Sequence, residues 1–255
     1  QAVNPQVLSS FGRTASLIQE EDRFLNGMAA ASLEQAEIPV NGNLRFLTLD
    51  CEAAFRSDSL IQLPRVLLAR ALRLAVEAVG GALDFRQLET ALQGIEVRDS
   101  GSVTSDEGKA TLTWNSERIH AFQSQPVEPF RTLVTLPGET ESIEFGWNVT
   151  AQILPSSWLP EPEDQRLHAR LDQNKVEGQI FLRSAQKGDR MTPLGMEGTK
   201  LVSDILCEMK LTRAAKARLP IICDFVGPLW VPGGPIAERA KVTGQSESLD
   251  RKSVV

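Results

Sequence analysis

The residues best suited to chemistry lie in the run RSAQKGDRMTPLGMEGTK, which extends from Arg183 to Lys200. Four cations, three glycines and one proline share these 18 residues. Glycine reaches backbone angles that other residues resist, so the chain can turn sharply here and bring its amide groups near a partner. We interpret the run as an irregular ligand-binding loop, ringed with positive charge by Arg183, Lys187, Arg190 and Lys200.

Regular elements flank this loop and must position it. The apolar spacing predicts strands over 179–182, 220–225 and 229–231, and helices over 200–209 and 213–219. Thr212 is a suitable N-cap for the second of these helices. Residues 175–244 therefore predict a small, basic α+β domain.

Charge is distributed unevenly along the 255 residues, whose formal net charge is −6. Residues 1–100 hold 9 Lys/Arg and 13 Asp/Glu, and residues 101–174 hold 5 and 11. Residues 175–255 hold 13 Lys/Arg and 9 Asp/Glu, which gives this segment a net charge of +4. A polyanion such as RNA would be attracted to the last segment, although a solvated charged face would show the same composition.

No pattern in the sequence points to catalysis or to a metal site. His120 and His168 lie far apart, with no Cys or carboxylate at the spacing of metal ligands. Glu161 and Glu163 lie in a polar connector, where nothing would shift their pKa values. No local pattern places a base beside a nucleophile. We therefore predict no catalytic, cofactor-binding or metal-binding residue in this chain.

The basic segment is similar to the C-terminal domain of the tRNA(Ile)-lysidine synthetase (TilS) family. The positions that carry this resemblance are Arg183, Gly188-Asp189-Arg190, Pro193-Leu194-Gly195-Met196, Gly198-Thr199-Lys200, Ser203-Asp204, Arg218-Leu219-Pro220 and Trp230-Val231-Pro232-Gly233. The resemblance is specific over residues 175–242 and continues, in helix pattern only, over residues 4–95. The sequence departs from the family pattern at Glu197 and Leu201, where many relatives carry lysine.

The resemblance implies a tRNA-binding role for the cations of the basic domain. The predicted tRNA-binding residues are Arg183, Lys187, Arg190, Lys200, Lys210, Arg213, Lys216 and Arg218. A-form RNA is recognised largely through phosphates, sugars and shape, which suits lysine and arginine on loops. The opposing interpretation is that Arg183 or Arg190 pairs with Asp189 or Asp204 and fixes the loop.

The resemblance also implies a larger enzyme. In that family an N-terminal domain uses ATP to adenylate the wobble cytidine of an isoleucine tRNA, and lysine then displaces AMP. The Ser-Gly-Gly-x-Asp-Ser type loop that holds the ATP phosphates there does not occur in this sequence. We therefore expect this chain to be inactive alone, with ATP and Mg²⁺ bound by a separate N-terminal catalytic domain. The implied partners are that domain and the acceptor stem of the tRNA, and a homodimer stays open.

Residues 1–95 predict a helical bundle that contacts tRNA or links domains. Apolar residues recur at helical spacing from Val7 to Met28, and a second helix begins at Leu63-Pro64 and stops at Gly80-Gly81. Asp84 caps a third helix that runs through Leu92. The arginines of the second helix, at positions 65, 70 and 73, are suited to RNA or to exposed ion pairs.

Residues 96–174 predict a strand-rich segment. Short alternating runs occupy residues 110–114, 132–136, 142–145 and 149–153, and residues 167–171 continue the pattern. Residues 160–164 form an acidic, proline-bearing connector, which we take as the internal boundary. The tail, residues 245–255, is polar and is expected to fray.

The expected fold is α+β, with an N-terminal helical bundle, a strand-rich middle and a small C-terminal α+β domain. No apolar run approaches the ~18 residues of a membrane span, and the N-terminus has no signal pattern, so we predict a soluble protein without a membrane partner. The odd number of cysteines, three, suits the cytoplasm. Gln1 in place of an initiator Met suggests a piece of a longer chain.

An alternative function remains open at this stage. The basic loop would also suit docking on an acidic surface of another domain, without direct RNA contact. Charge alone does not separate an RNA-binding portion of a ligase from a protein-interaction module.

Overall fold

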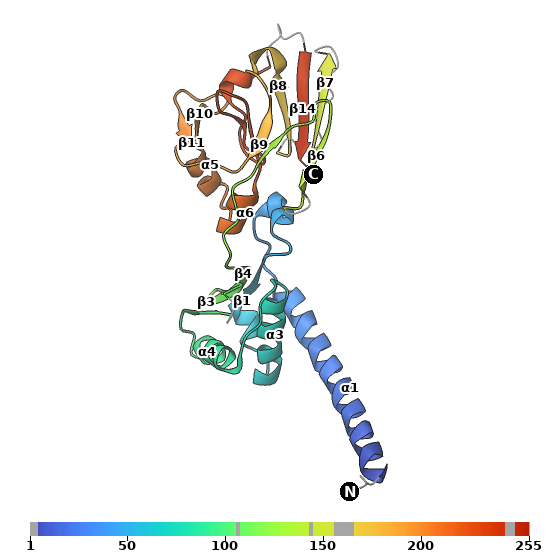
Figure 1. The fold of residues 1–255 in the computed structure, drawn as a ribbon. Helices are drawn as coiled ribbons and strands as arrows, with labels where there is room; N and C mark the ends of the chain where they lie inside the picture. Colours follow the sequence, from blue (N-terminus) through green and yellow to red (C-terminus); the bar gives the residue numbers. More distant parts are fainter. Residues whose placement is uncertain (1–4, 106–107, 143–144, 156–165, 243–247, 255) are drawn as a thin grey trace. The chain divides into compact units, whose positions relative to one another are not determined.

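The computed structural model describes residues 5–105, 108–142, 145–155, 166–242 and 248–254. The fold is α+β, as expected (Figure 1). Two compact units divide the chain, and each is described by itself. The first unit takes residues 1–39 and 50–125, and the second takes residues 40–49 and 126–255.

Three of the four described helices of the first unit form where the sequence predicts them, and the short α2 was not predicted. The four are α1 (Pro5–Ala36), α2 (Ser57–Leu60), α3 (Arg65–Glu77) and α4 (Phe85–Glu96). Gly80 has φ +81°, and the amide of Gly81 donates to the Val76 carbonyl at 3.0 Å, so α3 ends at the expected glycines. Asp84 caps α4 by accepting from the Gln87 amide, and the Gln87 side chain completes a capping box.

A four-stranded antiparallel sheet completes the first unit. Its order is β1-β4-β3-β2, formed by β1 (Glu52–Arg56), β2 (Gly101–Thr104), β3 (Ala110–Trp114) and β4 (Arg118–Gln123). Leu112 and Ile119 of the sheet share one buried apolar cluster with Leu72 of α3 and Leu92 of α4. The helices therefore gain a core by packing on a sheet, of which only β3 was predicted.

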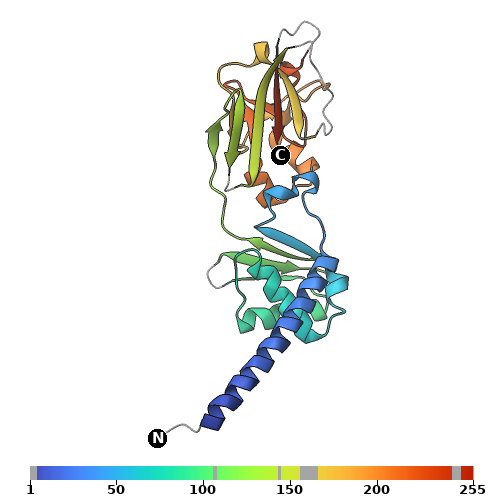
Figure 2. The same ribbon diagram turned by 90° about the vertical axis from the view of Figure 1, so that its right-hand side faces the viewer.

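The helix α1 is only partly covered within its unit. Its last turns bury Ala29, Leu33 and Ala36, and it contacts α3. Figures 1 and 2 show the N-terminal part of α1 continuing beyond this contact. Its apolar side chains Phe11 and Phe24 stay 69% and 67% exposed.

The second unit contains two four-stranded sheets and one hairpin. The strands are β5 (Arg131–Leu133), β6 (Gly138–Ser142), β7 (Trp147–Pro155), β8 (His168–Asp172), β9 (Phe181–Arg183), β10 (Arg190–Met191), β11 (Lys200–Leu201), β12 (Ile221–Cys223), β13 (Pro228–Trp230) and β14 (Ser248–Val254). The sheet orders are β6-β7-β14-β8 and β13-β12-β9-β5, and β10 pairs with β11. One buried apolar cluster joins both sheets, with Trp147 and Leu171 from the first and Leu182 and Trp230 from the second.

A short segment from early in the chain completes the core of the second unit. The 3-10 helix η1 (Gly42–Leu47) buries Leu44 and Leu47 in the cluster. Asn41 accepts a hydrogen bond from the Thr212 amide at 2.8 Å. No sequence pattern predicted that residues 40–49 belong to the second unit, because predicted helices precede and follow them in the chain.

The strands within residues 96–174 divide between the two units. Strands β2 to β4 pack on helices in the first unit, whereas β5 pairs with β9 in the second.

The expected connector at residues 160–164 lies outside the described residues. The prediction of a frayed tail is wrong for Ser248–Val254, which form β14 between β7 and β8, because backbone pairing does not require apolar side chains. Among the described helices, none has the length and hydropathy to cross a membrane.

We predict that Gly94→Ala destabilises the first unit. A Cβ at Gly94 in α4 would lie 2.4 Å from Nε1 of the buried Trp114, and overpacking of this kind costs about 1–3 kcal/mol. Gly12→Ala is the matched control, because Gly12 lies in α1 with open space around it and alanine favours a helix by about 1 kcal/mol. Urea denaturation of both variants measures the difference, and a G94A variant as stable as the G12A variant would contradict the close packing.

Candidate nucleic-acid interface

The predicted ligand-binding loop forms a hairpin in the second unit. The chain leaves β9, turns, pairs β10 with β11 and then enters α5 (Val202–Glu208). Gly195 and Gly198 near its tip have φ +76° and +92°, so the tip uses backbone angles that favour glycine. Figure 1 shows β10, β11 and α5 on one side of this unit, away from β6 and β7.

Arg183 is a structural residue at the base of the hairpin. Its guanidinium donates to both carboxylate oxygens of Asp189, at 2.6 and 2.8 Å, and its side chain is only 9% exposed. Burial raises the pKa of Asp189, but hydrogen bonds from Arg183 and the Gln186 amide outweigh this effect, so the pKa lies below its ordinary value. For Arg183 the geometry therefore favours the loop-fixing interpretation.

The tip of the hairpin is anchored on a segment near η3 (Glu238–Ala240). The amide of Gly195 donates to the Glu238 carboxylate at 2.8 Å, and the amide of Leu194 donates to the Ile236 carbonyl at 2.9 Å. The Glu238 amide donates in turn to the Thr192 carbonyl at 2.8 Å. Because base and tip are both held, the hairpin has a defined shape despite its irregular backbone.

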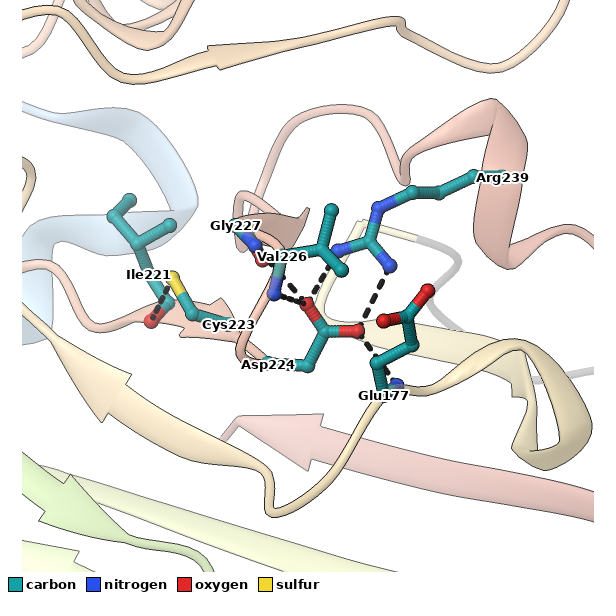
Figure 3. A network of polar contacts seen from close by, with 7 residues as sticks. All are labelled: Glu177, Ile221, Cys223, Asp224, Val226, Gly227 and Arg239. Carbon is teal, nitrogen blue, oxygen red and sulfur yellow. Dashed lines mark hydrogen bonds and ion pairs between the residues drawn. The ribbon is translucent and has the colours of Figure 1, made fainter.

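A second buried ion pair holds the turn that follows β12 (Figure 3). Asp224 is 1% exposed, and both its oxygens accept from Arg239, at 2.6 and 2.8 Å. The same carboxylate accepts from the amides of Glu177, Val226 and Gly227. Burial raises the pKa of Asp224, but these hydrogen bonds outweigh it and leave the pKa below its ordinary value. No sequence pattern predicted this ion pair, because Asp224 and Arg239 are separated by 15 positions.

The eight predicted cations fall into three groups. Arg183 and Arg218 are buried, and Arg218 donates to the Leu47 carbonyl at 3.1 Å. Lys200 and Lys216 are half-buried and contact Glu208 and the Cys207 sulfur, at 2.5 and 3.2 Å. The remaining four are exposed and have no side-chain hydrogen bond or ion pair within the described part of the chain; they are Lys187, Arg190, Lys210 and Arg213.

The exposed cations lie on two elements. Lys187 and Arg190 belong to the hairpin, whereas Lys210 and Arg213 lie between α5 and the start of α6 (Arg213–Arg218). Thr212 caps α6 as predicted, accepting from the Ala215 amide at 3.3 Å. Exposed cations on fixed backbone suit the binding of phosphate groups.

The described residues place no metal-binding cluster in either unit. Within them, no three His, Cys, Asp or Glu side chains come together in a way that would hold a metal ion. His120 contacts the buried Glu52, with 3.3 Å between Nε2 and a carboxylate oxygen.

Comparisons with known proteins agree with the resemblance seen in the sequence. Residues 180–251 match a family model described as the TilS substrate C-terminal domain. The tRNA(Ile)-lysidine synthase of Symbiobacterium thermophilum is 28% identical over 89% of this chain and 48% of its own length. That of Caldanaerobacter subterraneus is 23% identical over 92% of this chain and 49% of its own length.

A solved structure of a TilS C-terminal domain is also similar, at 24% identity and a TM-score of 0.44, over 50% of this chain and 96% of that chain. The chain spans about half the length of these two curated relatives. The chain thus resembles the C-terminal portion of tRNA(Ile)-lysidine synthases, with the TilS substrate C-terminal domain matched at residues 180–251.

Proposed function

We propose that this chain is the tRNA-binding C-terminal portion of a tRNA(Ile)-lysidine synthase. The observation that carries the proposal is the pair of exposed cations Lys187 and Arg190, which lie without side-chain partners among the described residues on an anchored hairpin. This hairpin lies within the residues that match the TilS substrate C-terminal domain.

Binding would be electrostatic and would depend on the shape of the hairpin. Lysine and arginine displace counterions from RNA phosphates, so each contact adds affinity that falls as salt rises. A loop that is already ordered loses little conformational entropy on binding. In this proposal Arg183 is a positioning residue, because it orders the hairpin through Asp189 without reaching the RNA.

The whole enzyme would divide its work between two parts. An N-terminal catalytic domain would bind ATP and Mg²⁺ and ligate lysine to the wobble cytidine in the cytoplasm, while this portion holds the acceptor stem of the isoleucine tRNA. Within the described residues no metal-binding cluster is found, and the sequence contains no phosphate-binding loop of the family type.

A docking function is the second candidate, and α1 favours it. Phe11, Ile18 and Phe24 of α1 are each more than half exposed. Exposed apolar side chains gathered on one element often mark a protein interface. Docking through α1 and RNA binding through the hairpin use different units and are compatible.

We predict that Lys187→Gln and Arg190→Gln weaken tRNA binding without lowering stability. Each substitution removes one phosphate contact, so the slope of log affinity against log salt should fall by up to about one unit. Arg118→Gln is the matched control, because Arg118 is an exposed arginine on β4 of the other unit. Filter binding at several salt concentrations measures the slopes; parent slopes in both hairpin variants would refute the phosphate contacts.

We predict the opposite pattern for Arg183→Gln, with Arg190→Gln as the control on the same hairpin. Loss of Arg183 leaves the Asp189 carboxylate buried and unmatched, which costs about 3 kcal/mol and lowers the melting temperature by several degrees. Asp189→Asn added to Arg183→Gln should restore part of this stability. Unchanged melting of the R183Q variant would assign Arg183 to the binding surface instead.

The lowered pKa of Asp189 also predicts a pH dependence of stability. Because its pKa is below the ordinary value of 3.8 in the folded state, its ionised form stabilises the fold above that value. This contribution is lost as pH falls through the folded pKa. Urea denaturation between neutral and acidic pH should show a smaller acid loss in Asp189→Asn than in the parent, and equal losses would argue against a charged pair.

A further inference from the structure

A pocket of about 460 Å³ opens beside the hairpin of the second unit. One wall comes from the hairpin, with Arg190, Thr192 and Thr199. The facing wall comes from the turn after β12, with Val226 and Pro228. Ligand pockets commonly range over about 300–1,000 Å³ and combine an apolar surface with a few polar groups, and this pocket fits that description.

Both walls are held in place by hydrogen bonds. The Thr192 carbonyl accepts from the Glu238 amide at 2.8 Å, which fixes the hairpin wall. The amides of Val226 and Gly227 donate to Asp224, whose carboxylate is held by Arg239, as Figure 3 shows. The pocket is therefore largely formed before any ligand arrives, which lowers the entropy cost of binding.

Among the described charged side chains that line this pocket, one cation has no hydrogen-bond or ion-pair partner. Arg239 lines it, but its guanidinium is paired with Asp224. Glu238 also lines it, and its carboxylate accepts from the Gly195 amide and from Lys241. Arg190 is exposed and has no side-chain partner in the described ranges, so an anionic group would meet an available guanidinium.

We propose that this pocket receives one unpaired nucleotide of the bound RNA, an inference that rests on the proposed function and specifies its ligand. Arg190 binds the phosphate, the hydroxyls of Thr192 and Thr199 face the sugar or the base edge, and Val226 and Pro228 cover the apolar base face. A paired base within an RNA helix does not fit this pocket, because both of its faces are stacked on neighbouring bases.

The neighbouring charge favours a nucleotide within a strand over a free nucleotide. Lys187 lies three positions before Arg190 on the same hairpin and is also exposed. A strand whose end enters the pocket would thus meet a second cation with an adjoining phosphate, whereas a mononucleotide would use Arg190 alone.

The test compares a blunt RNA duplex with the same duplex carrying a short single-stranded 3′ extension, each bound to the full chain. The extension should raise the affinity of the parent by about fivefold or more, the gain expected from one well-packed base. Val226→Asp should abolish this gain, measured against the same variant's binding of the blunt duplex, because it places a carboxylate on the pocket wall. Val226 is 57% exposed, so the substitution should not prevent folding.

Met196→Asp is the matched control, because Met196 is a 49% exposed apolar residue on the same hairpin and does not line the pocket. It should keep the gain from the extension. A gain lost equally in both variants would mean that a general change in charge, and not the pocket, is responsible, and would overturn the inference.

The remaining outcomes separate this inference from the proposed function. Equal affinity of the parent for both RNAs, with a clear salt dependence, would overturn the pocket assignment and leave RNA binding intact. Binding of neither RNA would overturn both. Displacement of the extended RNA by AMP or CMP at concentrations matching the RNA affinity would assign the pocket to free nucleotides, and equally effective displacement by polyglutamate would assign it to an acidic protein; either result overturns the inference.

Discussion

Pairing of buried carboxylates with arginine is the constraint on which the second unit depends. Much of this unit is irregular chain, which cannot satisfy its amides through strand or helix ladders. Asp189 and Asp224 replace those ladders: each is held by an arginine and accepts from the backbone of its own turn. A buried carboxylate is costly without such partners, so the hairpin and the turn keep their shape only while Arg183 and Arg239 remain in place.

Local patterns predicted those parts of the fold that form by local interactions. Thr212 and Asp84 cap helices where the sequence places them, and β3 covers the expected residues. The strand β1 was missed because it forms by pairing with the distant β4, whereas β2 and β4 form local hairpins with β3 and were missed all the same. The same distinction holds for the candidate site. The sequence identifies the cations, but the burial of Arg218 depends on the Leu47 carbonyl, which lies 171 positions away.

Burial and pairing also change the meaning of the charge asymmetry. The last segment has an excess of four positive charges, yet several of its cations are already matched by carboxylates within the unit. An electrostatic surface built from the remaining cations is local and follows particular elements, the hairpin and the turn before α6. Net charge thus indicates which part of the chain is rich in cations, while the fold decides which of their side chains are available.

The contribution of residues 40–49 to the second unit has a consequence for biosynthesis. Leu44 and Leu47 leave the ribosome well before Trp230 and Ile222, the core residues with which they cluster. In the interval the chain makes residues 50–125, which form a unit with a core of their own and are able to fold first. The nascent chain must therefore hold an apolar segment without these partners until residues 222–230 have been translated. During that interval a chaperone would be the available cover for Leu44 and Leu47.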